Sequence, residues 1–185
     1  MILNKLKISL DIDDTIAGFS ISYKKRFKTK PKYDWCISRN VNNILINEKD
    51  FWLNLPVIRK PNFNPILYCT SRISNKRWTK QYLENNDFPK APVFQVPGYN
   101  SPKSKVLKGR CSVHIEDSPN QWKSLNLAGI PCLLIDSPNN KDYGPMLKIY
   151  SLDYEEIEDA YNLALEMDVF KDFKLYYEQG INRSN

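Results

Sequence analysis

Histidine and long apolar runs are scarce in this 185-residue sequence, and each scarcity excludes a class of protein. The single histidine, His114, removes most zinc sites built from imidazole ligands, and a Ser-His-Asp triad would have to use it. No apolar run approaches the ~18 residues that a membrane-spanning helix needs. The N-terminus, MILNKLKISLD, turns acidic too soon for a signal peptide. We therefore expect a cytoplasmic protein that does not bind a membrane.

The cysteine pattern excludes further functions. Cys36, Cys69, Cys111 and Cys132 form no CxxC pair, and three of them lie in or beside apolar runs, so we expect reduced, buried thiols. A cysteine-dependent phosphatase needs an arginine six residues after its cysteine, but Asn75 stands there after Cys69. The pattern GxxxxGK followed by Ser or Thr is absent, which excludes a P-loop kinase.

Composition and charge are those of a globular protein with an anionic partner. Hydrophobic residues make up 42% and charged residues 26% of the chain, and the length suits one domain with an inserted subdomain. The 27 Lys and Arg against 21 Asp and Glu give a formal net charge of +6. This charge favours a phosphorylated small molecule, a nucleotide or a nucleic acid, although a solvated basic surface would explain it equally.

Apolar runs that suit strands alternate with helix-like segments. The strands are predicted over 6–10, 65–69, 93–96, 112–116 and 132–135, and the helices near 76–86, 103–108 and 119–128. This alternation is typical of an α/β fold with a Rossmann-like parallel sheet of about five strands flanked by helices. Ligands of such sheets bind at the carboxyl ends of the strands.

Residues 17–56 interrupt the alternation, because they predict two helices near 18–28 and 40–50 without a strand between them. We interpret them as a small helical cap over a polar site; a helical connection packed on one face of the sheet is the alternative. The three prolines of 56–65 exclude a helix there, so the chain returns by an extended link.

The expected organisation has three parts. They are an α/β core of 1–16 plus 57–150, the helical cap of 17–56, and a C-terminal helical extension of 151–185 packed on the core. The extension is predicted to hold a helix over 153–167 with Asp153 as its cap. We expect it to brace the core or to contact a second subunit in a homodimer.

The stretch LKISLDIDDT at 6–15 is the one that suggests chemistry. A strand alternates its side chains with period two, so Asp11 and Asp13 lie near one another where the first strand ends. Two carboxylates at such a short distance repel each other unless a cation lies between them or one of them takes a proton. Mg²⁺ meets that need because it is small and prefers oxygen ligands. An acidic loop after a strand is the simpler interpretation.

Three more motifs lie where a site at Asp11 and Asp13 would need them. Thr70 and Ser71 end the second strand with donors suited to phosphate oxygens, and Lys105 in SPKSKVLKG could neutralise a phosphoryl group. The sequence HIEDSP ends the fourth strand with Glu116 and Asp117, which supply further carboxylates for a metal.

This order of motifs resembles the haloacid dehalogenase (HAD) superfamily of phosphohydrolases over roughly 6–137. DIDDT matches its DxDxT motif, and the strand-end Thr and Ser, the lysine and the closing acidic pair follow in the same order. Within the superfamily the chain looks most like the 5′(3′)-deoxyribonucleotidase branch, through an aromatic soon after DxDxT (Phe19), FWLNLP at 51–56 and CTS at 69–71.

The resemblance implies a role for each motif residue. Asp11 would be the nucleophile that forms an aspartyl-phosphate, and Asp13 would be the acid and base. The remaining implied roles are phosphate binding by Thr70, Ser71 and Lys105, contact with a base by Phe19, and Mg²⁺ binding by Asp11, Asp13 (through its carbonyl), Asp117 and Glu116. The implied activity is that of an Mg²⁺-dependent phosphatase of phosphomonoesters, nucleoside monophosphates above all.

Several alternatives stay open at this point. Lys103 and Lys108 compete with Lys105 for the phosphate, although the spacing favours Lys105. Either Glu116 or Asp117 could be the direct metal ligand, since Asp-Asp is the commoner pair in the family. The alternative functions are a nucleic-acid 3′-end phosphatase and a non-catalytic module that binds nucleotides or nucleic acid on the same fold.

Overall fold

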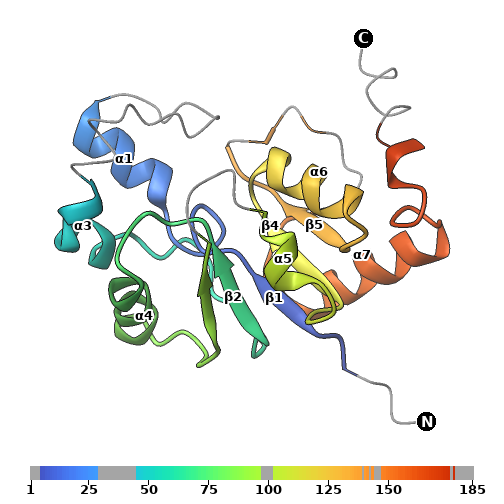
Figure 1. Cartoon of the computed structure of the whole chain (residues 1–185), viewed down its shortest axis with the longest axis horizontal. Coiled ribbons are helices and arrows are strands. Elements are labelled where there is room, and N and C mark those ends of the chain that lie inside the picture. The colour runs from blue at the N-terminus through green and yellow to red at the C-terminus, as the bar shows by residue number, and fades with distance from the viewer. Residues whose placement is uncertain are drawn as a thin grey trace.

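The computed structural model describes residues 5–28, 45–96, 102–138, 140–141, 143, 147–175 and 177. Six parallel strands in this part of the chain form one sheet in the order β3-β2-β1-β4-β5-β6 (Figure 1). They are β1 (Ile8–Leu10), β2 (Leu67–Thr70), β3 (Val93–Gln95), β4 (Val113–Glu116), β5 (Cys132–Ile135) and β6 (Lys148–Ile149). Helices flank the sheet, so the predicted α/β class with a Rossmann-like parallel sheet is confirmed.

All five predicted strands are present, and β6 is an additional one. With two residues, β6 is too short for a hydrophobic period to show in the sequence. It pairs in parallel with β5, where Ile149 lies opposite Ile135 and is buried. Strand β6 therefore forms because it pairs with β5, and its own two residues carry no pattern that would predict a strand.

The helices follow the predicted segments closely. They are α1 (Phe19–Phe27), α3 (Lys49–Leu53), α4 (Lys76–Asn85), α5 (Ser104–Leu107), α6 (Pro119–Leu127) and α7 (Tyr154–Glu166). The helix predicted near 40–50 lies partly outside the described residues. Residues 45–47 are helical, Glu48 interrupts the helix, and α3 extends three residues past the predicted end. No helix of the described residues is both long and apolar enough to cross a membrane.

Local chemistry sets where the helices begin. The side-chain oxygen of Asn75, which precedes α4, accepts a hydrogen bond from the Arg77 N–H at 2.9 Å. Helix α6 opens with Pro119, which suits the first helical position because an N–H there has no partner within the helix. Asp153 caps α7 as predicted, since its carboxylate accepts from the Glu155 N–H at 2.9 Å.

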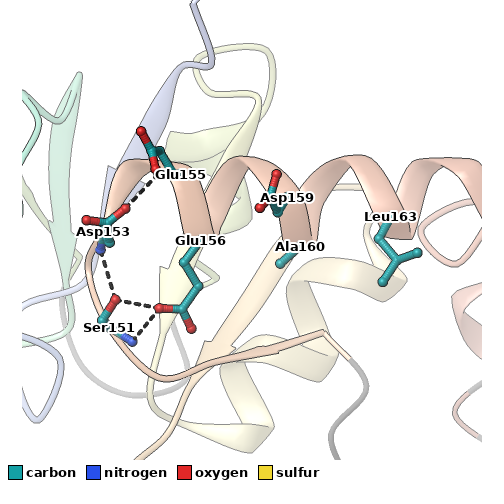
Figure 2. A pocket seen from close by; sticks show the side chains of 7 residues that line it. All are labelled: Ser151, Asp153, Glu155, Glu156, Asp159, Ala160 and Leu163. Carbon is teal, nitrogen blue, oxygen red and sulfur yellow. Dashed lines mark hydrogen bonds between the residues drawn. The ribbon is translucent and has the colours of Figure 1, made fainter.

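A pocket lies over the first turns of α7. Two of its acidic side chains, Asp153 and Glu156, accept hydrogen bonds from the backbone (Figure 2). The Glu156 carboxylate accepts hydrogen bonds from the N–H of Tyr150 (2.6 Å), the N–H of Ser151 (3.1 Å) and the Ser151 hydroxyl. The Ser151 hydroxyl accepts from the Asp153 N–H at 3.2 Å. These contacts fix the chain as it enters α7.

Helices α1 and α3 lie together beside α4, whereas α6 and α7 lie toward the other end of the sheet (Figure 1). Phe19 of α1 stacks on Trp52 of α3, with ring centroids 5.7 Å apart and planes 20° apart. Both helices belong to the segment 17–56, which the sequence predicts to be a cap. The extended link that follows it contains no helix, as its prolines predict.

The two ends of this helical segment lie side by side at the carboxyl end of β1. The Gly18 N–H donates to the Pro56 carbonyl at 2.8 Å, and the Ile58 N–H donates to the Ile16 carbonyl at 3.0 Å. Gly18 permits this close approach, since a Cβ there would lie 2.9 Å from Cγ of Pro56 and 3.0 Å from Cγ2 of Ile58. The chain thus leaves and rejoins the core at one point.

Substitution of Gly18 by alanine should destabilise the protein, because the new methyl group would meet the rigid ring of Pro56. We expect Gly18→Ala to lower the free energy of unfolding by about 1–3 kcal/mol, the usual effect of overpacking. Each kcal/mol should lower Tm by roughly 2–4 °C in thermal unfolding followed by circular dichroism. Lys25→Ala on the exposed face of α1 is the control, and an equal Tm for both variants would contradict the close approach.

Candidate functional site

The loop after β1 is a tight turn that points several carboxylates at the edge of the sheet. The Asp11 N–H donates to the Ile115 carbonyl at 3.0 Å, so Asp11 still pairs with β4. The N–H groups of Ile16 and Ala17 then both donate to the Ile12 carbonyl, at 3.0 and 2.9 Å, which closes one helical turn. This turn fixes the direction of each side chain between positions 11 and 17.

Asp14 anchors the turn to α1. Its backbone adopts a positive φ of 55°, a conformation that aspartate tolerates better than most residues. The Asp14 carboxylate accepts a hydrogen bond from the Ser20 N–H at 2.9 Å and another from the Ser20 hydroxyl. Asp14 therefore accepts from an N–H in the first turn of α1, where no acceptor within the helix is available, and ties the helix to the site.

Three buried carboxylates converge where β1 and β4 end. Asp11, Glu116 and Asp117 each offer an oxygen, and these oxygens lie within 4.8 Å of one another. The two parallel strands are neighbours, with Leu10 opposite Ile115, and this pairing brings the residues after both strands together. The triad could bind a metal ion. Both members of the predicted acidic pair belong to it, so neither alternative for the direct ligand is eliminated.

Lys103 provides the buried positive charge of the site. Its ammonium contacts the Asp11 carboxylate and lies 2.6 Å from Oε2 of Glu116, and its side chain is only 2% exposed. Lys105, which the spacing favours for the phosphate, is exposed, and so is Lys108, so among the three lysines only Lys103 lies against the carboxylates. Two residues along a helix point about 200° apart, so Lys103 and Lys105 cannot both face the sheet.

Burial and like charge give the triad unusual proton affinities. Burial raises the pKa of Asp11 to about 8; Lys103 opposes this rise, and Glu116 and Asp13 add to it. Burial also raises the pKa of Asp117 well above its usual range, and the nearby carboxylates of Asp14, Glu116 and Asp11 raise it further. Without a cation, the folded protein therefore favours protonated Asp11 and Asp117.

Glu116 and Lys103 behave in the opposite way. Burial alone would raise the pKa of Glu116, but Lys103 and His114 together lower it below its usual value. Burial would likewise lower the pKa of Lys103, but Asp11 and Glu116 raise it well above its usual value, so the ammonium stays charged. His114 packs within β4, with Nδ1 2.9 Å from the Ser9 hydroxyl and Nε2 3.5 Å from Glu116.

Asp13 does not join the carboxylate triad; it pairs with an arginine that the sequence analysis missed. Nε of Arg72 donates to both carboxylate oxygens of Asp13, at 2.9 and 3.0 Å, and Nη2 lies 2.8 Å from Oδ1. The residue was visible in the motif LYCTSR, directly after the two predicted phosphate-binding residues. The predicted contribution of Asp13 to a metal is its backbone carbonyl, which this ion pair leaves untouched.

Arg59 is the second residue that the sequence analysis missed. Its Nη1 donates to the carbonyls of Asp14 and Thr15, both at 3.3 Å, and its Nη2 donates to the Asp136 carbonyl. Burial lowers the pKa of Arg59, although nearby carboxylates oppose the shift. As the one arginine of the link 56–65, it clamps the turn after β1 to the loop after β5.

Hydroxyl groups complete the edge of the sheet. Thr70 is buried at the end of β2, and its hydroxyl accepts from the Arg72 N–H at 3.3 Å. The hydroxyls of Ser71 and Thr15 are buried and find no hydrogen-bond partner among the described residues. Because buried polar groups are usually satisfied, two such donors at adjacent strand ends suit the oxygens of an anionic ligand.

Phe19 lies inside an aromatic cluster with Trp52 and Phe51 of α3. Its ring is fully buried, stacked on Trp52 and in edge contact with Phe51 at a centroid distance of 5.9 Å. Contact between Phe19 and a base would require these aromatic contacts to open. That role stays a prediction, and in this conformation Phe19 serves the packing of α1 against α3.

The charges around the triad do not balance. The carboxylates of Asp11, Asp13, Asp14, Glu116 and Asp117 are buried, and the lysine and arginine side chains that interact with them are Lys103, Arg72 and the half-buried Arg59. With all groups ionised, five negative charges face three positive ones, an excess that either protons on Asp11 and Asp117 or one divalent cation would cancel. Comparison with known proteins assigns no identity to this site: no family model matches the chain, and no curated protein matches it.

The raised pKa of Asp11 predicts how a cation and pH act together on stability. The folded protein holds a proton on Asp11 up to about pH 8, whereas an unperturbed aspartate loses it near 3.8. Without a cation, stability should therefore fall as the pH rises through this window. A divalent cation replaces the proton, so its effect on Tm should be larger at about pH 8 than at about pH 5.

Thermal unfolding with and without MgCl₂ at both pH values measures this difference. Asp117→Asn should remove most of the response to the cation, because it deletes a charged ligand of the triad. Asp159→Asn, an exposed change on α7, should respond like the parent protein. An equal rise in Tm at both pH values would contradict the assigned pKa of Asp11.

Proposed function

We propose that the protein is a metal-dependent phosphohydrolase of the HAD type that hydrolyses phosphomonoesters, nucleoside monophosphates above all, through an aspartyl-phosphate on Asp11. The observation that supports this most strongly is the arrangement of Asp11. Its carboxylate lies in the triad with Glu116 and Asp117 and also touches the ammonium of Lys103, at the carboxyl edge of a parallel sheet. The proposed nucleophile Asp11 thus lies in direct contact with the proposed phosphate-binding charge of Lys103 and next to the other cation ligands.

The donor set of the triad fits Mg²⁺. Asp11, Glu116 and Asp117 offer only carboxylate oxygens, which are the ligands that hard cations prefer. These residues would hold the ion together with the Asp13 carbonyl that the family resemblance implies. Bound there, Mg²⁺ would neutralise negative charge on the phosphoryl oxygens.

The reaction follows from the side chains in two steps. A carboxylate oxygen of Asp11 attacks phosphorus, the ester P–O bond breaks, and the leaving alcohol oxygen takes a proton from the Asp13 carboxyl. Water then attacks the phosphorus of the aspartyl-phosphate and gives a proton to Asp13. Inorganic phosphate leaves, and the Asp11 carboxylate and the Asp13 carboxyl are both restored.

Phosphate binding falls to Lys103 and the free hydroxyls. Lys103 already lies against the nucleophile, so its charge would be shared with the transferred phosphoryl group in the transition state. Ser71 and Thr15 would donate to phosphoryl oxygens, which supplies the partners that their hydroxyls lack within the described chain. The phosphate-binding role expected of Lys105 thereby passes to Lys103.

Asp11→Asn should abolish phosphate release, because an amide cannot attack phosphorus. We expect a loss of at least about 10³-fold in kcat for deoxynucleoside monophosphates with MgCl₂, a large part of what a nucleophile contributes. Release of inorganic phosphate is the measurement, and EDTA should abolish it in the parent protein. Wild-type protein that is inert toward nucleotides, sugar phosphates and aryl phosphates would contradict the proposal.

The two lysines offer a matched pair of variants. Lys103→Met should lower kcat/KM by at least about 10²-fold, the scale of removing one preorganised electrostatic contact. Lys105→Met removes the same charge two residues away from an exposed position and should change kcat/KM by less than about twofold. Equal losses in both variants would contradict the placement of Lys103, and Tm values confirm that each variant is folded.

A 3′-end phosphatase acting on nucleic acid is the second candidate. Helix α4 begins shortly after the site loop that follows β2, and it carries exposed Lys76, Arg77 and Lys80. Such a row of cations suits a phosphate backbone. Affinity for a 3′-phosphorylated oligonucleotide that falls steeply with salt would favour this candidate over a nucleotidase.

A further inference from the structure

The ion pair between Arg72 and Asp13 is the most demanding electrostatic feature outside the carboxylate triad. The Arg72 side chain has no exposed surface, and burying a guanidinium is costly unless its charge and its donors are matched. Its charge is matched by Asp13, to which Nε donates, but neither Nη1 nor Nη2 makes a hydrogen bond within the described residues, and Nη2 contacts Asp13 only as an ion pair. The burial of Arg72 therefore needs a reason beyond the filling of space.

The surroundings of Arg72 leave its guanidinium little freedom. The group lies over the ring of Trp52 from α3 at 5.4 Å and over the ring of Tyr82 from α4 at 5.2 Å. Its backbone carbonyl accepts a hydrogen bond at 2.8 Å from Nε2 of Gln95 in β3. Aromatic rings and a fixed backbone thus orient a rigid, planar group.

Asp13 is held by this group through both of its carboxylate oxygens. Nε contacts Oδ1 and Oδ2, and Nη2 contacts Oδ1, so the plane and the position of the carboxyl are both restrained. A general acid works only within hydrogen-bond reach of the oxygen that it protonates, and a misplacement of about 1 Å can cost about 10²-fold. The gain in rate from a correctly placed Asp13 carboxyl could therefore offset the free-energy cost of burying the Arg72 guanidinium.

We propose that Arg72 is a positioning residue, which holds the Asp13 carboxyl where it transfers a proton to the leaving oxygen. The inference rests on the proposed phosphohydrolase function and deepens it, because it links proton transfer at the core to the helices around it. Trp52 belongs to the helical segment 17–56, so the packing of that segment on the core contributes to the orientation of the acid.

The role predicts a dependence on the leaving group. An alkyl phosphate needs a proton on its departing oxygen, whereas 4-nitrophenyl phosphate releases a stable phenolate that needs little help. Arg72→Gln and Arg72→Lys should lower kcat about tenfold to a hundredfold for a deoxynucleoside monophosphate. For 4-nitrophenyl phosphate the loss should stay within about threefold, and KM should change little for either substrate. A purely structural role would lower both rates alike.

Steady-state kinetics with both substrates, together with Tm of each variant, test the inference. Arg72→Lys keeps the charge but loses the planar fork, so it separates position from charge. Arg110→Gln, which changes an exposed arginine in the turn before β4, is the control and should leave both rates unchanged. In an Asp13→Asn background, Arg72→Gln should cause no further loss, since the two residues act as one unit.

The outcomes separate the two proposals. A loss confined to the alkyl substrate and absent in the Asp13→Asn background supports the positioning role. Equal losses on both substrates, an effect on KM alone, or an additive loss in the double variant overturns it, while the proposed function stands. Wild-type protein that is inert toward both substrates overturns the proposed function and the positioning role together.

Discussion

The contact of the Lys103 ammonium with two buried carboxylates is the interaction on which the site depends. It joins Asp11 and Glu116, which stand at the ends of two adjacent parallel strands. Three carboxylates this close would repel each other strongly inside a protein if no cation were present. One lysine does not compensate all of them, and the pKa values of Asp11 and Asp117 remain raised. The fold thus buries a deficit of positive charge, which is what a cation site requires.

Main-chain contacts hold this unfavourable cluster in place. The turn after β1 closes on the Ile12 carbonyl, Asp14 ties it to α1, and Arg59 clamps its carbonyls to the loop after β5. Gly18 lets the returning link pass close beside the turn. Each of these contacts has a backbone group on at least one side, so atoms outside the triad hold the turn. A strained site persists only where its surroundings determine its shape in this way.

Much of this arrangement could be predicted from the sequence, because it follows from the periodic pattern of apolar residues and from the positions where the strands end. Apolar runs of four to five residues between helix-like segments indicate a parallel sheet, and the carboxyl ends of its strands meet at one edge. Asp11, Glu116 and Asp117 follow two such runs, so their convergence could be expected. Strand β6 could not be predicted, since two residues show no periodic pattern and its pairing with β5 is a contact between segments distant in the sequence.

The sequence by itself determined the class of fold, the strand ends that carry the carboxylates and the place of the turn that follows β1. Only the tertiary structure decided which cation each carboxylate meets. Lys103 faces the sheet while Lys105 faces solvent, and Arg72 reaches Asp13 between rings from two different helices. The physical reason is that the rotational phase of a short helix and the direction of a loop side chain are set by packing against distant segments, which no local pattern encodes.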